Sequence, residues 1–209
     1  MLRGDETEIR LPVDNWAAMS RKAVFLDLNG TLVLPMKQEC LADLYPIPGA
    51  ISAVARLGRA RFVCPVITVQ SRIAKGLFTA TEFLNWFRAF ATAANDQGAN
   101  LKGPYVCPHR YAQPCDCKKP NTTLYEKAIR DLGLSVDHSF VVGDSPDDIR
   151  AASRLGLRSC LVRTGWAADL EMVTAVEGEV SLVAPSVVEA VDWILLQDTP
   201  SSAGGLLAI

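Results

Sequence analysis

Apolar runs rich in β-branched residues alternate along this chain with segments whose apolar positions recur at helical spacing. The apolar runs predict strands at 22–28, 61–71, 103–107, 139–144, 158–165 and 180–185. The helically spaced segments predict helices at 48–58, 79–96, 120–133, 145–156 and 186–197. Strands that alternate with helices form a mostly parallel sheet with helices on both faces. The pattern therefore predicts a doubly wound α/β fold.

Local signals refine two of these segments. The helix at 79–96 opens with a Thr-x-x-Glu capping pattern, and its phenylalanines share one side, which predicts core packing rather than a cofactor site: Phe83, Phe87 and Phe90. Proline cannot donate a backbone hydrogen bond to a neighbouring strand, so Pro65 argues against a fully paired central position for the strand at 61–71.

Composition and charge narrow the class of protein. The 209 residues, 49% of them hydrophobic, suit one α/β domain with a sizeable core. The net charge of −2 disfavours nucleic-acid and membrane partners. The chain divides into an N-terminal extension at 1–21, a domain at 22–197 and a flexible tail at 198–209. Without a signal-peptide pattern, or an apolar run near the roughly 18 residues of a membrane span, we expect a cytoplasmic protein.

Polar residues follow three of the predicted strands. Asp27, Thr68 and Asp144 each stand where an apolar run ends, and the carboxyl ends of parallel strands meet at one edge of the sheet. Two acids at one edge repel each other, so Asp27 and Asp144 suggest a hard cation such as magnesium. Alternatively, each acid caps the next helix, and Ser145 and Pro146 suit a helix start. These residues alone leave both readings open.

Three of the six cysteines and one of the two histidines fall in one loop. Cys107, His109, Cys115 and Cys117 supply three thiolates and one imidazole, a complete tetrahedral zinc set without an open position. The alternative is a redox pair at Cys115 and Cys117 with an incidental histidine. The scattered cysteines are expected to be small core residues: Cys40, Cys64 and Cys160.

Four motifs occur in a fixed order, and together they span most of the chain. They are Asp-Leu-Asn-Gly-Thr at 27–31, Thr68, Lys-Lys-Pro at 118–120, and Gly-Asp-x-x-x-Asp at 143–148. This order resembles the haloacid dehalogenase superfamily, which implies a Rossmann-like fold. The resemblance also implies that Asp27 attacks a phosphoryl group and forms an aspartyl-phosphate. Magnesium would be bound by the Asp27 carboxylate, the Asn29 backbone carbonyl and Asp144.

The resemblance gives roles to the other motif residues as well. Thr68 would hydrogen-bond the phosphoryl oxygens, and Lys119 would pair with Asp27 and the phosphate. Asp148 would support the magnesium site without ligating directly. The expected catalytic set is therefore Asp27, Asn29, Thr68 and Lys119.

The loop at 107–117 resembles the zinc loop of the branch that contains heptose bisphosphate and histidinol-phosphate phosphatases. That branch lacks a large cap domain and acts on small phosphorylated metabolites, so we expect such a substrate and a monomer. The resemblance makes Ser71, Arg72 and Lys118 candidate substrate contacts. This chain departs from the branch by having Val69 in place of asparagine, Arg72 in place of glycine, and Lys118 in place of arginine. These changes argue against a heptose bisphosphate substrate.

Asn29 is the largest departure, because phosphatases of the superfamily have an acid/base aspartate there. An asparagine cannot transfer a proton at neutral pH, and such transfer is typically worth about 10²–10⁴-fold in rate. Three functions follow: a slow magnesium-dependent phosphatase or one specialised for activated phosphates, a non-hydrolytic phosphate-binding or regulatory protein, and a phosphotransferase. Asn29 could also have been introduced to trap a complex, but the departures at 69 and 72 favour a natural branch.

Overall fold

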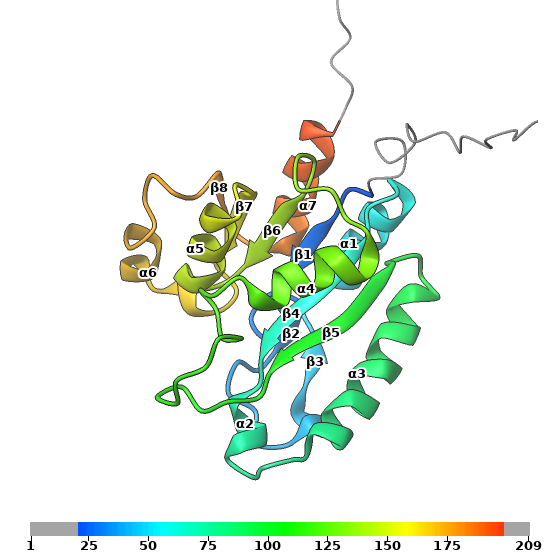
Figure 1. The fold of residues 1–209 in the computed structure, drawn as a ribbon. Helices are drawn as coiled ribbons and strands as arrows, with labels where there is room; N and C mark the ends of the chain where they lie inside the picture. Colours follow the sequence, from blue (N-terminus) through cyan, green and yellow to red (C-terminus); the bar gives the residue numbers. More distant parts are fainter. Residues whose placement is uncertain (1–20, 199–209) are drawn as a thin grey trace, which may run out of the picture.

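The computed structural model describes residues 21–198, and its centre is a six-stranded sheet whose strand pairings are all parallel (Figure 1). The strand order is β5-β4-β1-β6-β7-β8. The strands are β1 Val24–Leu26, β4 Cys64–Val69, β5 Leu101–Cys107, β6 Phe140–Gly143, β7 Arg158–Val162 and β8 Leu182–Ala184. A separate antiparallel pair is formed by β2 Val33–Leu34 and β3 Tyr45–Pro46. The predicted extension and tail lie outside the described residues, except for Arg21 and Asp198.

Helices cover both faces of the sheet, which confirms the doubly wound α/β prediction (Figure 1). One face packs against α1, α3 and α7, and the other against α4 and α5. Val24 and Leu26 of β1 belong to one buried cluster and Phe25 to the other, because side chains alternate along a strand. The helices are α1 Ala50–Arg59, α2 Ser71–Ala74, α3 Ala80–Asn95, α4 Thr123–Leu132, α5 Pro146–Arg154, α6 Leu170–Thr174 and α7 Val187–Gln197, with 3-10 helices at Leu41–Asp43 and Trp166–Ala168.

The helix α3 matches its local prediction, and the strand β4 corrects one. A capping box of Thr79 and Glu82 opens α3, Phe83 and Phe87 are buried, and Phe90 packs partly buried against them. β4 lies between β5 and β1, so it occupies the internal position that its proline argued against. Its register against β5 shifts between Pro65 and Ile67, where β5 has one residue more than β4, so the pairing of this central strand is irregular.

Two of the three scattered cysteines meet the core prediction. Cys64 and Cys160 are buried in the sheet, whereas Cys40 is exposed and caps the 3-10 helix at Leu41–Asp43. The prediction for Cys40 was therefore wrong. Its thiol accepts a hydrogen bond from the backbone N–H of Ala42, a role that a sequence pattern of apolar positions does not reveal.

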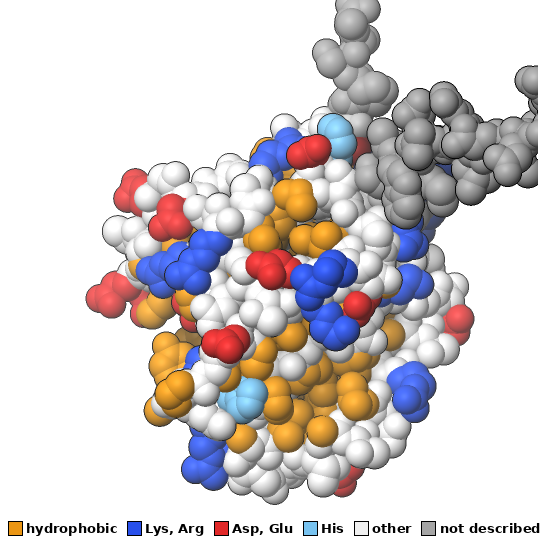
Figure 2. Space-filling view, in the orientation of Figure 1, with side chains coloured by type: hydrophobic (Ala, Val, Ile, Leu, Met, Phe, Trp, Pro, Cys, Tyr) orange, Lys and Arg blue, Asp and Glu red, His pale blue; other side chains and the backbone are white. Residues whose placement is uncertain are grey.

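The carboxyl edge of the sheet is open on the described part of the chain. Between β1 and α1 the chain forms only the β2–β3 pair and a 3-10 helix, so no large cap domain is present within residues 21–198. Figure 2 shows basic and acidic side chains interspersed on one face, without a field of a single sign. None of the helices in the described range is long and apolar enough to span a membrane.

Candidate active site

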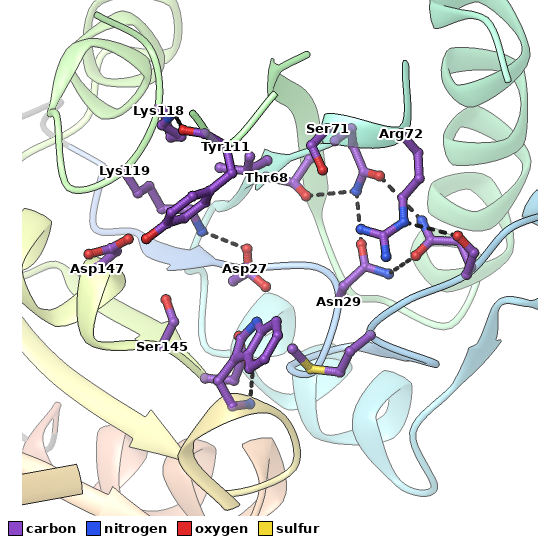
Figure 3. Close-up of a pocket in the computed structure, with 16 residues that line it drawn as sticks. Asp27, Asn29, Thr68, Ser71, Arg72, Tyr111, Lys118, Lys119, Ser145 and Asp147 are labelled. Carbon is purple, nitrogen blue, oxygen red and sulfur yellow. Dashed lines mark hydrogen bonds and ion pairs between the residues drawn. The ribbon is translucent and has the colours of Figure 1, made fainter. Parts of the chain in front are cut away.

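The ends of three neighbouring strands bring the predicted polar residues into one pocket (Figure 3). Asp27 follows β1, Thr68 lies near the end of β4, and Asp144 follows β6. β1 lies between β4 and β6, so these side chains converge where α/β sheets commonly bind ligands. The pocket has a volume of about 210 Å³ and is lined by Asp27, Asn29, Met36, Gln38, Thr68, Val69, Gln70, Ser71, Arg72, Tyr111, Lys118, Lys119, Asp144, Ser145, Asp147 and Trp166.

Lys119 joins two acids at the floor of the pocket. Its Nζ donates to Asp27 Oδ1 and to Asp148 Oδ1, each at 2.5 Å, and to the Ile67 carbonyl at 3.0 Å. All three charged side chains are buried. The ammonium therefore lies where it can pair with the Asp27 carboxylate and with an anion that Asp27 attacks.

Three carboxylates and one ammonium are buried close to one another: Asp27, Asp144, Asp148 and Lys119. Burial raises the pKa of Asp27 to about 6, against the opposing effect of Lys119. Burial, followed by the charges of Asp27 and Asp148, raises the pKa of Asp144 well above its usual range. The excess of negative charge fits a bound cation, and carboxylate oxygens are the ligands that magnesium prefers.

Asp144 and Asp148 have different surroundings. Asp148 accepts from Lys119 with Oδ1 and from the Ser145 hydroxyl, at 2.7 Å, with Oδ2. Ser145 and Asp148 form the capping box of α5, so Ser145 rather than Asp144 caps that helix. Asp144 instead accepts from the backbone N–H of Trp166 at 2.8 Å. Asp144 therefore remains the better candidate for a metal ligand. Asp148, whose two oxygens already accept hydrogen bonds, is better placed to hold Lys119 and Ser145.

Two glycines leave room for the Asp144 carboxylate. A methyl group at Gly30 would come within 2.5 Å of Asp144 Oδ2, and one at Gly165 within 1.9 Å. Gly30 also has a φ of +88°, in the left-handed region that favours glycine. The turn after β1 and the turn after β7 therefore both depend on glycine to hold this acid in place.

Asn29 belongs to a closed ring of three side-chain amides. Its Nδ2 donates to Gln38 Oε1 at 3.2 Å, Gln38 Nε2 donates to Gln70 Oε1 at 3.3 Å, and Gln70 Nε2 donates to Asn29 Oδ1 at 2.8 Å. Gln70 Nε2 also donates to the Thr68 hydroxyl at 2.9 Å. Each amide is both donor and acceptor, so the ring closes only if all three members can donate.

The predicted substrate contacts all line the pocket, but Lys118 has another partner as well. Its ammonium donates to the backbone carbonyls of Arg110, Tyr111 and Gln113, which ties the loop after β5 together. Arg72 uses Nε to donate to the Gln38 carbonyl at 3.0 Å. Ser71 begins the short helix α2. Arg72 is therefore connected to the amide ring, and the charge of Lys118 is shared with the loop.

Several lining residues had no role in the sequence prediction. Gln70 lies inside the strand predicted at 61–71, and Trp166 directly follows the strand predicted at 158–165, so their positions near strand ends offered a signal. Gln38 and Tyr111 lie in irregular loops, where spacing indicates nothing about which side chain enters a pocket.

The four predicted zinc ligands come together. Their ligand atoms all lie within 4.8 Å of one another. Cys107 Sγ is 3.7 Å from Cys115 Sγ, and His109 Nδ1 is 3.2 Å from Cys117 Sγ. Two thiolates on one tetrahedral zinc, each bonded at about 2.3 Å, are separated by about 3.8 Å. The donor set and spacing fit a structural zinc ion better than a pair of redox cysteines with an incidental histidine.

We expect metal analysis to find one zinc ion per chain, and the Cys117→Ser variant to lose most of it. Three remaining ligands bind zinc less tightly than four, and the loop depends on them for its shape. Cys40→Ser is the matched control, because this exposed thiol lies outside the cluster. A metal-free protein whose loop stays folded would contradict the zinc site.

Comparison with known proteins gives consistent results. A family model described as HAD-hydrolase-like matches residues 116–190. A D-glycero-beta-D-manno-heptose-1,7-bisphosphate 7-phosphatase from Haemophilus ducreyi is 34% identical over 190 residues, covering 84% of this chain and 100% of that protein. The enzyme of the same name from Escherichia coli K12 is 31% identical, and the match covers 88% of this chain and 95% of that protein.

Solved structures show the same fold. The D,D-heptose 1,7-bisphosphate phosphatase from B. bronchiseptica, determined with magnesium and phosphate, matches with a TM-score of 0.73 and 24% identity. The match covers 84% of this chain and 99% of that one. The overall fold is therefore one that these proteins share.

Proposed function

This chain belongs to the haloacid dehalogenase superfamily and is a phosphoric monoester hydrolase, and we propose that it is a magnesium-dependent phosphatase of a small, sugar phosphate-like metabolite. The observation that carries the proposal is the pairing of buried Asp27 with Lys119 in a pocket shared with Asp144. The names of the relatives support a phosphorylated sugar as the substrate class. The residues Val69, Arg72 and Lys118, which differ from those of the branch, argue against heptose bisphosphate itself as the substrate of this chain.

Asp27 is the proposed nucleophile. Its carboxylate oxygen forms a bond to phosphorus while the bond from phosphorus to the ester oxygen breaks, which leaves an aspartyl-phosphate and an alkoxide that takes a proton from water to become the alcohol. Water then attacks the phosphorus, releases phosphate and restores Asp27. Lys119 and Thr68 would hold the phosphoryl oxygens in both steps. Bound magnesium would supply positive charge that lets an anionic nucleophile approach an anionic ester.

Asn29 holds a structural position in the amide ring and cannot act as an acid or a base. Both ends of its carboxamide are engaged by Gln38 and Gln70, and an amide has no proton to transfer. Phosphoryl transfer to Asp27 therefore lacks acid assistance, and release of the phosphate lacks a base. This observation also favours a second candidate function, in which a long-lived aspartyl-phosphate passes to an acceptor other than water.

A screen of phosphorylated metabolites on the natural chain and on Asn29→Asp tests the proposal. We expect the variant to hydrolyse a generic aryl phosphate at least about tenfold faster, because a carboxyl group restores proton transfer. The free energy of unfolding of the variant should also fall, by about 1–3 kcal/mol. A carboxylate cannot donate a hydrogen bond, so the contact from residue 29 to Gln38 Oε1 becomes one between two acceptors.

Asn85→Asp is the control for this exchange, since Asn85 lies exposed on α3 and far in sequence from every motif. It should change neither rate nor stability appreciably. Equal rates for the natural chain and Asn29→Asp would show that proton transfer does not limit turnover. If neither protein hydrolyses any phosphate ester, the phosphatase proposal fails.

A further inference from the structure

Two aromatic side chains stand exposed at the pocket that contains Asp27. Trp166 is 47% exposed and Tyr111 is 81% exposed, yet both line the pocket. They come from separate elements, the 3-10 helix after β7 and the loop after β5, and Figure 3 shows Tyr111 projecting into the pocket near Asp147. Large rings left in water at a pocket are typical of a surface that a ligand covers.

Both rings are held in place by their surroundings. The backbone N–H of Trp166 donates to Asp144 Oδ2 at 2.8 Å, which fixes the residue beside a predicted metal ligand. The Lys37 ammonium lies 4.9 Å from the centre of the Trp166 ring, and the Lys118 ammonium lies 5.3 Å from that of Tyr111. A cation over an aromatic face is attracted by the ring. Each ring is therefore held by a neighbouring lysine on the lining of the pocket.

Several polar side chains of the pocket wall are engaged with one another, while Ser71, Arg72 and Lys118 remain as candidate contacts for the phosphorylated sugar. Asn29, Gln38 and Gln70 bond in a closed ring that also reaches Thr68. Ser145 donates to Asp148. A bare sugar would need hydrogen-bond partners for each of its hydroxyl groups as it leaves water. This wall offers aromatic surface more readily than it offers such partners.

We propose that Trp166 and Tyr111 form a ring-binding subsite, so that the substrate is a phosphorylated sugar carrying a flat aromatic ring, as a nucleotide does. The inference rests on the proposed phosphatase function and specifies its substrate. The phosphate lies at Asp27 and Lys119 while the ring stacks on the aromatic side chains at the mouth.

Titration calorimetry with two matched probes tests this subsite. Adenosine 5′-monophosphate and ribose 5-phosphate share a phosphorylated pentose and differ by the flat base. We measure both in the presence of magnesium on the Asp27→Asn protein, which prevents turnover. The nucleotide is expected to bind at least about tenfold more tightly, the range of base stacking on aromatic side chains.

Adding Trp166→Ala or Tyr111→Ala should remove most of that difference and leave the affinity for ribose 5-phosphate unchanged. The contact between Trp166 and Asp144 uses the backbone, so the alanine variant retains it. Trp166→Phe should keep most of the preference. Leu170→Ala is the control, because Leu170 is a similarly exposed apolar residue, 65% exposed, outside the pocket lining.

Equal affinity for the two probes, or an equal loss of both in Trp166→Ala, would overturn the subsite. If neither probe binds while the natural chain binds magnesium and beryllofluoride, the subsite is rejected and the phosphatase proposal stands. If beryllofluoride does not bind either, the phosphatase proposal itself is rejected.

Discussion

Asp27→Asn is expected to lower phosphatase activity by about 10³-fold or more, because an amide cannot form the aspartyl-phosphate. The same exchange should abolish binding of beryllofluoride with magnesium, measured by calorimetry, since that anion mimics a phosphoryl group bonded to the carboxylate. Asp27 pairs with Lys119 at 2.5 Å in the natural chain. Asparagine keeps the size of the side chain, so the pocket retains its shape.

Asp192→Asn is the control for Asp27→Asn. Asp192 pairs with Arg56 on the surface, with half of its side chain exposed, and lies outside the pocket. Its activity should match that of the natural chain. Turnover that survives in Asp27→Asn at more than a tenth of the natural rate would exclude Asp27 as the nucleophile.

Lys119→Met is expected to reduce the free energy of unfolding by about 3–5 kcal/mol, because it leaves buried carboxylates without their cation. Asp27 and Asp148 each lose a 2.5 Å partner in this variant. Chemical denaturation of both proteins measures the loss. Activity should fall with it, since the phosphoryl group would lack a positively charged neighbour.

Lys127→Met provides the comparison for this effect. Lys127 pairs with Asp131 at 2.8 Å on the exposed side of α4, where both side chains remain about half in water. Such surface pairs contribute about 0–1 kcal/mol. A loss for Lys119→Met no greater than that for Lys127→Met would show that the buried cluster does not depend on its ammonium.

The sequence predicted the sheet and its helices because their signals are local and long enough to be periodic. It missed β2, β3, α2 and α6, each of which spans five residues or fewer, too short for a period to emerge. The internal position of β4 was also missed, because a register shift after Pro65 depends on the partner strand, which one segment does not specify.

The site was predictable to the extent that its residues stand at fixed places in a motif. Asp27, Thr68, Lys119 and Asp144 follow strands or lie in recognisable segments, and the structure brings all four into one pocket. Gln38 and Tyr111 enter that pocket from irregular loops, and their placement depends on tertiary packing. The amide ring could not be predicted for the same reason, since Gln38 enters it from an irregular loop and Gln70 lies 32 residues further along the chain.

The ring of Asn29, Gln38 and Gln70 also has an evolutionary consequence. A lineage that carries it does not regain an aspartate at position 29 freely, because the reverse exchange alone leaves two acceptors facing each other in a partly buried network. Residues that share one hydrogen-bond network have effects that depend on one another. A single reversion to aspartate at position 29 therefore gains proton transfer at a cost in stability, and a second change at Gln38 or Gln70 would be needed to recover that stability.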